Sequence, residues 1–296
     1  MTPPAYGAVF QATGITDPAV FTGRPPVNAD LLFRRLWYAD DTQGKDKGED
    51  REDPQTAHLR AVVDAAGRVP SDLLGAVHVR RRAAAAALAA SHRPEWTVKN
   101  VVITPCWRVV VGHGETTVHE TALTFSPTYG VPMWPGSSLK GVAAAQARAT
   151  CPEATVARLF GSPRPVSRER DTHQADTHQA DTHQVEAHKA AVTVLDALPL
   201  VPQSLAVDVL TPHVQPYYQD VNERPKQVST PPAEYHNPAP VRFLAVEATP
   251  LHTSLIGPAA DVEEFFRLLR DGVDDLGLGG KTAAGYGYCT VTEAGA

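Results

Sequence analysis

The stretch DVEEFFRLLRDGVDDLGLGGKTAAGYGYCTVT (residues 261–292) decides the fold, because it joins an amphipathic helix, a glycine-rich loop and a strand. Asp261 is placed to cap the helix, with Glu264 three residues later as in a capping box. An apolar stripe at helical spacing follows, formed by Val262, Phe265, Phe266, Leu269, Val273 and Leu276. The glycine loop then leads into YGYCTVT (286–292), which predicts the last strand.

The alternation of strands and helices extends back to Lys99. NVVITPCWRVVVG (100–112) is rich in β-branched residues and predicts a strand, and SSLKGVAAAQARA (137–149) predicts an alanine-rich helix. Three further strands are predicted in AVTVLDALPL (191–200), LAVDVL (205–210) and VRFLAVEATPL (241–251). The order strand, helix, strand pair, helix, strand is that of the split βαβ, ferredoxin-like (RRM-like) fold of the α+β class, whose open sheet face often binds RNA.

We expect residues 1–98 to form a mostly helical N-terminal region, followed by the ferredoxin-like domain over residues 99–296. Asn28 precedes an apolar stripe and predicts a helix start. Helical patterns resume in AHLRAVVDAAGRV (57–69) and HVRRRAAAAALAAS (78–91). The arginines of the second pattern, Arg80 to Arg82, could form a phosphate patch, but a solvated helix face is the favoured interpretation.

Two insertions interrupt the predicted domain. The first, residues 167–190, carries a five-residue repeat with four histidines, His173, His178, His183 and His188. A spacing of five precesses around a helix, so these imidazoles do not share one face. We interpret the repeat as a low-complexity loop in preference to a metal site.

The second insertion, residues 211–240, holds seven prolines and predicts a long extended loop. His213 and Tyr217 in this loop are candidate RNA-binding residues, because aromatic rings can stack on bases. Anchoring of the tyrosines on the core is the alternative, and it is slightly favoured.

Composition argues against several classes of protein. No apolar run approaches the ~18–20 residues of a membrane span, and MTPPAYGAVF at the N-terminus lacks the pattern of a signal peptide. The cysteines Cys106, Cys151 and Cys289 lie far apart, which argues against a zinc site or a disulfide framework and suits the cytoplasm. The formal net charge is −6, so an RNA site would have to be local, with neighbouring proteins supplying the remaining positive field.

The glycine loop LGLGGKTAAGYG (276–287) has the end of a nucleotide-binding P-loop but not its start. A P-loop needs glycine at position 275, where this chain has Asp275, and it leads from a strand into a helix. An ATPase and a nucleotide cofactor are therefore not expected. A tight turn would use one or two glycines, so we interpret the five glycines with Lys281 and Thr282 as a nest for a sugar–phosphate chain.

A second phosphate-binding candidate is PGSSLKG (135–141), at the start of a predicted helix. Ser137 or Ser138 can cap this helix, and its first amides then point outward. Lys140 opposes the helix dipole unless an anion is bound, in which case amides, hydroxyls and ammonium converge on one phosphate. A capped helix with one exposed lysine explains the motif equally well.

Together these motifs resemble the RAMP superfamily of CRISPR–Cas proteins, and more narrowly the subunit-six family of the type III-B Cmr effector complex. The resembling segments lie in the family's order over most of residues 99–290. They are HETALTFSPTYGVPMWPGSSLKG (119–141), VLDALP (194–199), VDVLTPHVQPYY (207–218), PVRFLAVE (240–247) and the glycine loop. The chain departs from the family in lacking an arginine soon after SLKG, where Arg148 is displaced, and in its histidine repeat.

The resemblance implies a non-catalytic RNA-binding subunit without cofactor or metal. Its partners would be crRNA, bound at its 3′ part, target RNA and other RAMP subunits of a multi-subunit complex in antiviral defence, with no membrane. By that analogy the crRNA phosphates would lie on Ser137, Ser138, Lys140, Gly279, Gly280, Lys281 and Thr282.

The alternative is a RAMP-type endoribonuclease that uses histidine as general acid–base. The candidate residues are His113, His119 and His213. Such chemistry needs a positioned pair, or a base beside a cationic stabiliser. Sequence spacing alone establishes neither arrangement.

Overall fold

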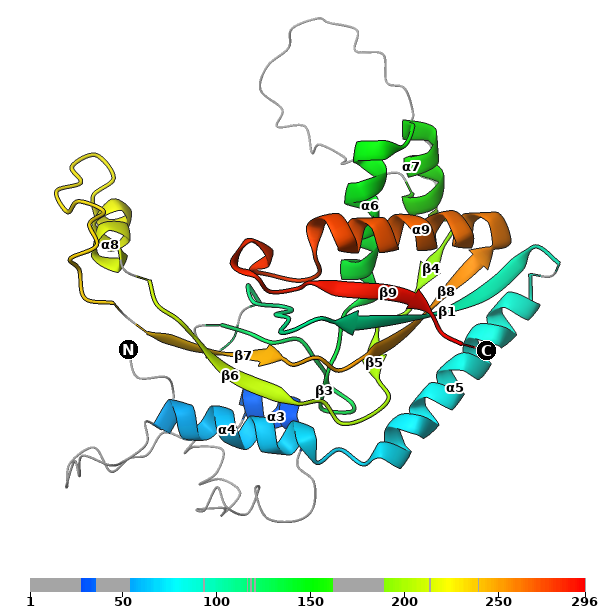
Figure 1. Ribbon diagram of the computed structural model, residues 1–296, viewed down its shortest axis with the longest axis horizontal. Helices are drawn as coiled ribbons and strands as arrows, with labels where there is room; N and C mark the ends of the chain where they lie inside the picture. The colour runs from blue at the N-terminus through cyan, green and yellow to red at the C-terminus, as the bar shows by residue number, and fades with distance from the viewer. Residues whose placement is uncertain are drawn as a thin grey trace, which may run out of the picture.

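The computed structural model describes residues 28–35, 54–92, 94–115, 117, 119, 121–161, 189–212, 214–238 and 240–295. Its centre is an antiparallel sheet in the order β4-β8-β1-β9, with β5 also paired to β8 (Figure 1). The strands are β1 (Trp96–Pro105), β4 (Thr193–Val194), β5 (Leu198–Pro199), β8 (Leu251–Pro258) and β9 (Cys289–Glu293). Since α6 (Gly136–Thr150) follows β1 and α9 (Ala259–Leu276) follows β8, the predicted ferredoxin-like fold is confirmed.

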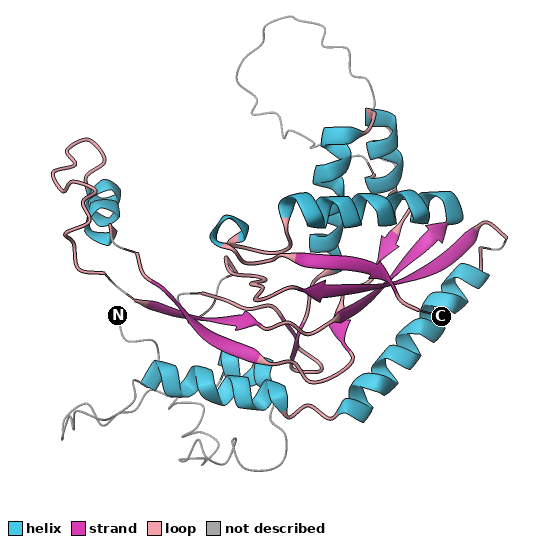
Figure 2. Ribbon diagram, in the orientation of Figure 1, coloured by secondary structure: helices cyan, strands magenta, loops and turns pink. Residues whose placement is uncertain are grey.

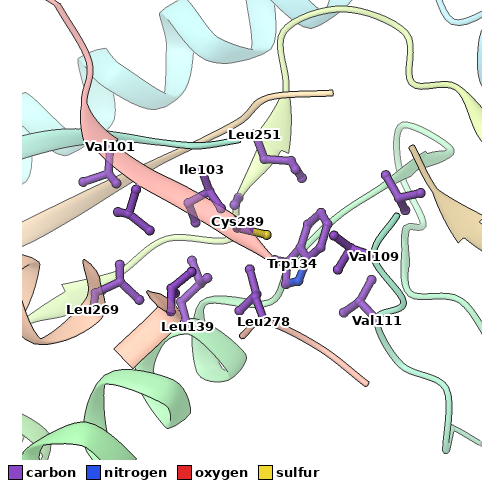
Figure 3. Packing of buried hydrophobic residues seen from close by; sticks show 14 of the residues in the cluster. Val101, Ile103, Val109, Val111, Trp134, Leu139, Leu251, Leu269, Leu278 and Cys289 are labelled. Atoms are coloured by element: carbon purple, nitrogen blue, oxygen red, sulfur yellow. The ribbon is translucent and has the colours of Figure 1, made fainter. Parts of the chain in front are cut away.

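The main core lies between the sheet and the two helices α6 and α9 (Figure 3). Val101 and Ile103 of β1 point into it because alternate strand residues share a face. Leu139 of α6 and Leu269 of α9 meet them there, and each such burial is worth ~1.5–3 kcal/mol. The predicted stripe of α9 is buried along its length except at Leu276, which is 47% exposed at the helix end.

The predicted caps of the two core helices are wrong. Each helix begins directly after a proline in extended conformation, Pro135 for α6 and Pro258 for α9, without a side-chain cap. Asp261 instead lies inside the first turn of α9, where it pairs with Arg158 of α7 (Glu153–Phe160). In both cases the proline ends an extended segment, and the helix begins at the next residue.

Helix α5 (Ser71–Ala90) covers part of the second face of the sheet, so the face expected to be open is open only in part. Ala85 and Ala89 of α5 pack against Ile256 of β8, with Val98 of β1 beside them. The helices predicted over 57–69 and 78–91 are confirmed as parts of α4 (Pro54–Gly67) and α5.

A second unit is the ribbon of β6 (Leu205–Leu210) and β7 (Val241–Val246), which extends away from the central sheet (Figure 2). The strand predicted over 241–251 therefore splits into β7 and the start of β8. Within the predicted extended loop 211–240, residues Gln215–Glu223 form helix α8, so that part of the prediction is wrong. A proline in the first turn, Pro216, is compatible with a helix.

Helix α4 packs on this ribbon, α3 (Ala29–Arg35) packs on α4, and both join the main core. Helices α3 and α4 lie beneath β6 and β7 in Figure 1, and Phe33 and Leu59 belong to the main hydrophobic cluster. Asn28 caps α3, since its Oδ1 accepts a hydrogen bond from Leu31 N at 3.1 Å, as predicted. A short hairpin of β2 (Phe125–Ser126) and β3 (Val131–Pro132) completes the fold. The histidine repeat lies outside the described residues.

Candidate nucleic-acid interface

The glycine loop is joined by backbone hydrogen bonds to the segment that follows β1. Gly280 N donates to Val110 O at 2.7 Å, and Gly287 N donates to Arg108 O at 3.0 Å. The loop is closed on itself by a hydrogen bond from Leu278 N to Gly287 O at 2.8 Å. Its middle is a single 3₁₀ turn, Thr282–Ala284. The loop is therefore a fixed feature of the surface.

Backbone geometry accounts for most of the glycines, so the expectation that a turn needs only one or two is wrong. Four of the five have positive φ: Gly277, Gly279, Gly285 and Gly287. A Cβ added at Gly279 would lie 2.2 Å from Val110 O, and one at Gly287 would lie 2.3 Å from Leu278 O. The glycines allow close backbone approach within this chain, and their number alone does not imply a ligand.

Lys281 projects from the loop beside an imidazole and an aromatic ring. Its backbone is left-handed, with φ 60°, and its Nζ lies 5.8 Å from the centroid of the Phe243 ring. The His113 side chain packs against Gly280, and its ring lies edge-on to Phe243. Partial burial lowers the pKa of His113, and the charge of Lys281 lowers it further. A neutral imidazole and a cation thus lie side by side at the rim of the loop.

At the start of α6, a carboxylate from this chain already accepts a hydrogen bond from a helix amide. Ser137 and Ser138 lie inside the first turn, so neither caps the helix. Gly136 N donates to Asp196 Oδ1 at 2.8 Å. Asp196 therefore takes the place of the anion that the motif predicted at that amide.

The two candidate motifs meet in a hollow of about 380 Å³, which we call the glycine-loop groove. One wall is the face of α6 with Ser138 and Gly141, and the other is the loop with Gly279 and Gly280. The core beneath holds both walls, because Leu139 of α6 and Leu278 of the loop are buried in the same cluster (Figure 3). Segments about 140 residues apart in sequence therefore form one surface feature.

Other predicted site residues lie around the groove or away from it. Lys281 and Thr282 directly follow Gly280 at the rim. Ser137 and Lys140 do not line the groove. Lys140 is two residues after Ser138, about 200° around the helix, and partial burial lowers its pKa.

The aromatic residues of the ribbon tip do not anchor it. Tyr217 lies on α8, which has no buried residue, and its ring contacts Tyr218, which is 59% exposed. The favoured interpretation, anchoring on the core, is therefore wrong. His213 lies outside the described residues.

His119 is a core residue. It is 8% exposed, stacks on Phe33 with ring centroids 4.4 Å apart, and its Nε2 lies 2.9 Å from Phe33 O. Burial lowers its pKa. A side chain so enclosed cannot reach an RNA hydroxyl without unpacking α3.

Sequence reasoning missed a network that fixes the loop to the ribbon. Asp208 of β6 accepts hydrogen bonds from Tyr286 Oη at 2.7 Å and from Arg108 Nη1 at 2.8 Å. Burial, followed by the Asp208 carboxylate, raises the pKa of Tyr286 to about 12. No spacing rule links these positions, although a lone acid in an apolar strand is a signal for a buried pair.

In the part of the chain that the structure describes, no group of three His, Cys, Asp or Glu side chains could hold a metal ion. Within the same residues, no helix combines the length and the apolar character needed to cross a membrane.

Comparison with known proteins finds a family, a curated relative and similar solved structures. Residues 101–290 match the RAMP superfamily. The curated relative "CRISPR system Cmr subunit Cmr6" of Pyrococcus furiosus is 27% identical over 221 residues. That alignment covers 61% of this chain and 64% of the relative, so the chain spans less than two thirds of the relative's length.

One of the solved structures supports the same fold. A chain of "Cryo-EM structure of the Type III-B Cmr-beta bound to cognate target RNA" superposes with a TM-score of 0.58 at 17% identity, covering 96% of this chain and 90% of that one. "Crystal structure of Cmr6 from Pyrococcus furiosus" aligns with a TM-score of 0.38 at 22% identity, covering 68% of this chain and all of the other.

Proposed function

This chain belongs to the RAMP superfamily, and on that premise we propose that it is a non-catalytic, RNA-binding subunit of a type III CRISPR effector complex. Residues 99–296 would be its RAMP domain, preceded by a mostly helical region over residues 1–98. Its partners would be crRNA, target RNA and other RAMP subunits in the cytoplasm. The relative named Cmr6 and the Cmr-beta complex with target RNA support this assignment.

The observation that carries the proposal is the meeting of the α6 face and the glycine loop in one groove beside Lys281. Four glycines and a serine line the groove beside five apolar residues, and at the glycines a sugar–phosphate backbone can approach the protein main chain. Lys281 would then neutralise one phosphate, with the Thr282 and Ser138 hydroxyls as hydrogen-bond partners. A chain with a net charge of −6 needs such a local arrangement.

Arg148 adds a cation to the same side of α6. It lies seven residues after Gly141, which is about two helical turns along the same face. The displaced arginine would therefore extend the RNA path along the helix, beyond the groove. It has a solvent-exposed side chain, as a phosphate contact requires.

Two lysines test the path of the RNA. Lys281→Ala should weaken RNA binding and reduce the slope of log affinity against log salt by ~1. Lys140→Ala removes the same charge from a position outside the groove, although the family analogy places it on the RNA as well. Fluorescence anisotropy with labelled single-stranded RNA over a salt series measures both quantities. Unchanged affinity and slope for Lys281→Ala would contradict the groove as RNA path, and an effect of Lys140→Ala alone would move the path to the other side of α6.

Assembly is tested separately. Affinity purification of the tagged full chain from its native host should recover other RAMP subunits together with a short RNA. Recovery of the chain alone would contradict the subunit assignment.

A second function, RNA cleavage, is favoured by one observation: His113 lies beside Lys281, which is the base and cationic stabiliser that the alternative requires. Among the described residues, Lys281 is the only charged group that shifts the pKa of His113, and no carboxylic acid is paired with the imidazole, so we retain the binding function as the proposal.

A further inference from the structure

A second hollow, of about 260 Å³, lies on the other face of the sheet between α5 and strands β1 and β8. We call it the α5 hollow. It is the part of the sheet face that α5 leaves uncovered, since Val102 faces His252 and Asn100 faces Ser254 across β1 and β8 there. Helical spacing explains the other wall: His78, Arg81 and Arg82 are related by three and four residues and share one face of α5.

Every titratable side chain that lines the α5 hollow is basic. They are His78, Arg81, Arg82 and His252. Among the described residues, neither arginine has a carboxylate within ion-pair distance. The nearest acid that acts on Arg81 is Asp196, whose Oδ1 is engaged by the α6 amide of Gly136. Of the two, Arg81 is partly buried and Arg82 is exposed. A partly buried cation without an ion-pair partner costs stability, and a bound anion reduces that cost.

The polar groups of the hollow are only partly satisfied within the described residues. Arg81 Nη2 donates to the backbone oxygen of Asp196, but Arg81 Nη1 is buried without a hydrogen-bond partner there. His78 Nε2 lies 3.0 Å from Pro199 O, so Nε2 carries the proton and donates it to this oxygen, and Nδ1 is an acceptor. Ser254 Oγ donates to Asn100 Oδ1 at 2.8 Å, which leaves the Asn100 amide NH₂ to donate.

We propose that the α5 hollow binds a phosphate group, held by Arg81 and Arg82 with His252 and Asn100 around it. Two guanidinium groups from one helix, with an imidazole and an amide from the facing strands, surround a tetrahedral anion from several directions. A planar carboxylate would be satisfied by a single guanidinium. The phosphate is either free, as in a mononucleotide, or carried on the end of an RNA chain. The inference does not depend on the glycine-loop groove.

Thermal unfolding of the full chain with inorganic phosphate, adenosine monophosphate or RNA tests the site. The variants are Arg82→Ala, which changes an exposed side chain, and Arg81→Gln. Arg80→Ala is the matched control, because it removes the same charge from the neighbouring position of α5 while Arg80 bonds Tyr129 Oη at 2.9 Å and does not line the hollow.

We expect millimolar phosphate or mononucleotide to raise the Tm of the wild type and of Arg80→Ala, with at least a tenfold weaker effect in Arg82→Ala. If Arg81→Gln does not fold, Arg82→Ala decides the result. Tighter binding of RNA with a terminal phosphate than of the same RNA with hydroxyl ends, lost in Arg82→Ala, identifies the phosphate as RNA-borne. An equal response to both RNAs identifies it as free. No stabilisation by any of the three ligands, or an equal loss in Arg80→Ala, overturns the proposal.

Discussion

Gly279 and Gly285 form a matched pair that measures what the contact between the glycine loop and Val110 contributes. Both have positive φ, +90° and +94°. A Cβ at Gly279 would lie 2.2 Å from Val110 O, whereas a Cβ at Gly285 meets nothing within 4 Å. Alanine at either position therefore strains the backbone, but only Gly279→Ala must also push the loop away from the segment after β1.

The expected magnitudes follow from these two contributions. Backbone strain costs ~1–3 kcal/mol in each variant. The displaced loop in Gly279→Ala adds ~1–3 kcal/mol for overpacking and about 1 kcal/mol for the hydrogen bond from Gly280 N to Val110 O. Gly279→Ala should thus be the less stable variant by at least ~2 kcal/mol, or roughly 4–8 °C in Tm for a chain of this size.

The assay is denaturant unfolding of both variants, with RNA affinity measured in parallel at one salt concentration. Gly279→Ala should lose RNA affinity as well, because Gly279 lines the groove, while Gly285→Ala should not. Equal losses of stability would refute the close approach to Val110. If the two variants differed in stability but bound RNA equally, the contact between Gly279 and Val110 would support folding and not RNA binding.

Three further predictions concern other parts of the chain. Deletion of residues 170–188 should leave soluble expression and complex assembly intact, because the repeat has too few apolar residues to join a core; loss of soluble protein would contradict this. Burial, with the neighbouring His119, lowers the pKa of His58 to about 4 from 6.5, so the unfolded state binds the proton first as pH falls. The free energy of unfolding should therefore drop by up to about 3 kcal/mol between pH 6.5 and 4, and His58→Phe should show a shallower decline in urea titrations. The isolated chain should neither cleave RNA nor hydrolyse ATP, with or without magnesium; cleavage that His113→Ala or His213→Ala abolishes while RNA binding survives would establish the nuclease.

The fold was predictable from sequence wherever one periodicity dominated. The apolar stripe of α9 and the β-branched run of β1 predicted a helix layer, a sheet layer and the order of elements in the domain. Capping rules predicted the start of α3 at Asn28 but not the starts of four helices that begin directly after a proline: Pro70, Pro135, Pro152 and Pro258. In these positions proline supplies the extended residue before the helix, and a serine or aspartate in the first turn is no longer needed as a cap.

The candidate site was only half predictable. The two motifs were visible because glycine and first-turn residues carry local constraints, but their meeting depends on how α6 and α9 pack. Asp196 was missed for the same reason: it joins the amide of Gly136, 60 residues away, and through its backbone oxygen it joins Arg81, 115 residues away. Spacing rules describe contacts within one helix or strand, whereas these contacts join three separate segments of the chain.

The acidic composition is consistent with two small cationic sites on opposite sides of the sheet. A chain that coated RNA with a basic face would neutralise many phosphates, and its affinity would fall steeply with salt, by about 0.7 log units per log salt for each phosphate on a single strand. Lys281 lies beside the glycine-loop groove, and Arg81 and Arg82 line the α5 hollow, in a chain whose net charge is −6. These two sites alone would therefore neutralise few phosphates. Its RNA contacts would position a strand whose main electrostatic attraction comes from neighbouring subunits, and the sheet between the two sites would act as a rigid spacer.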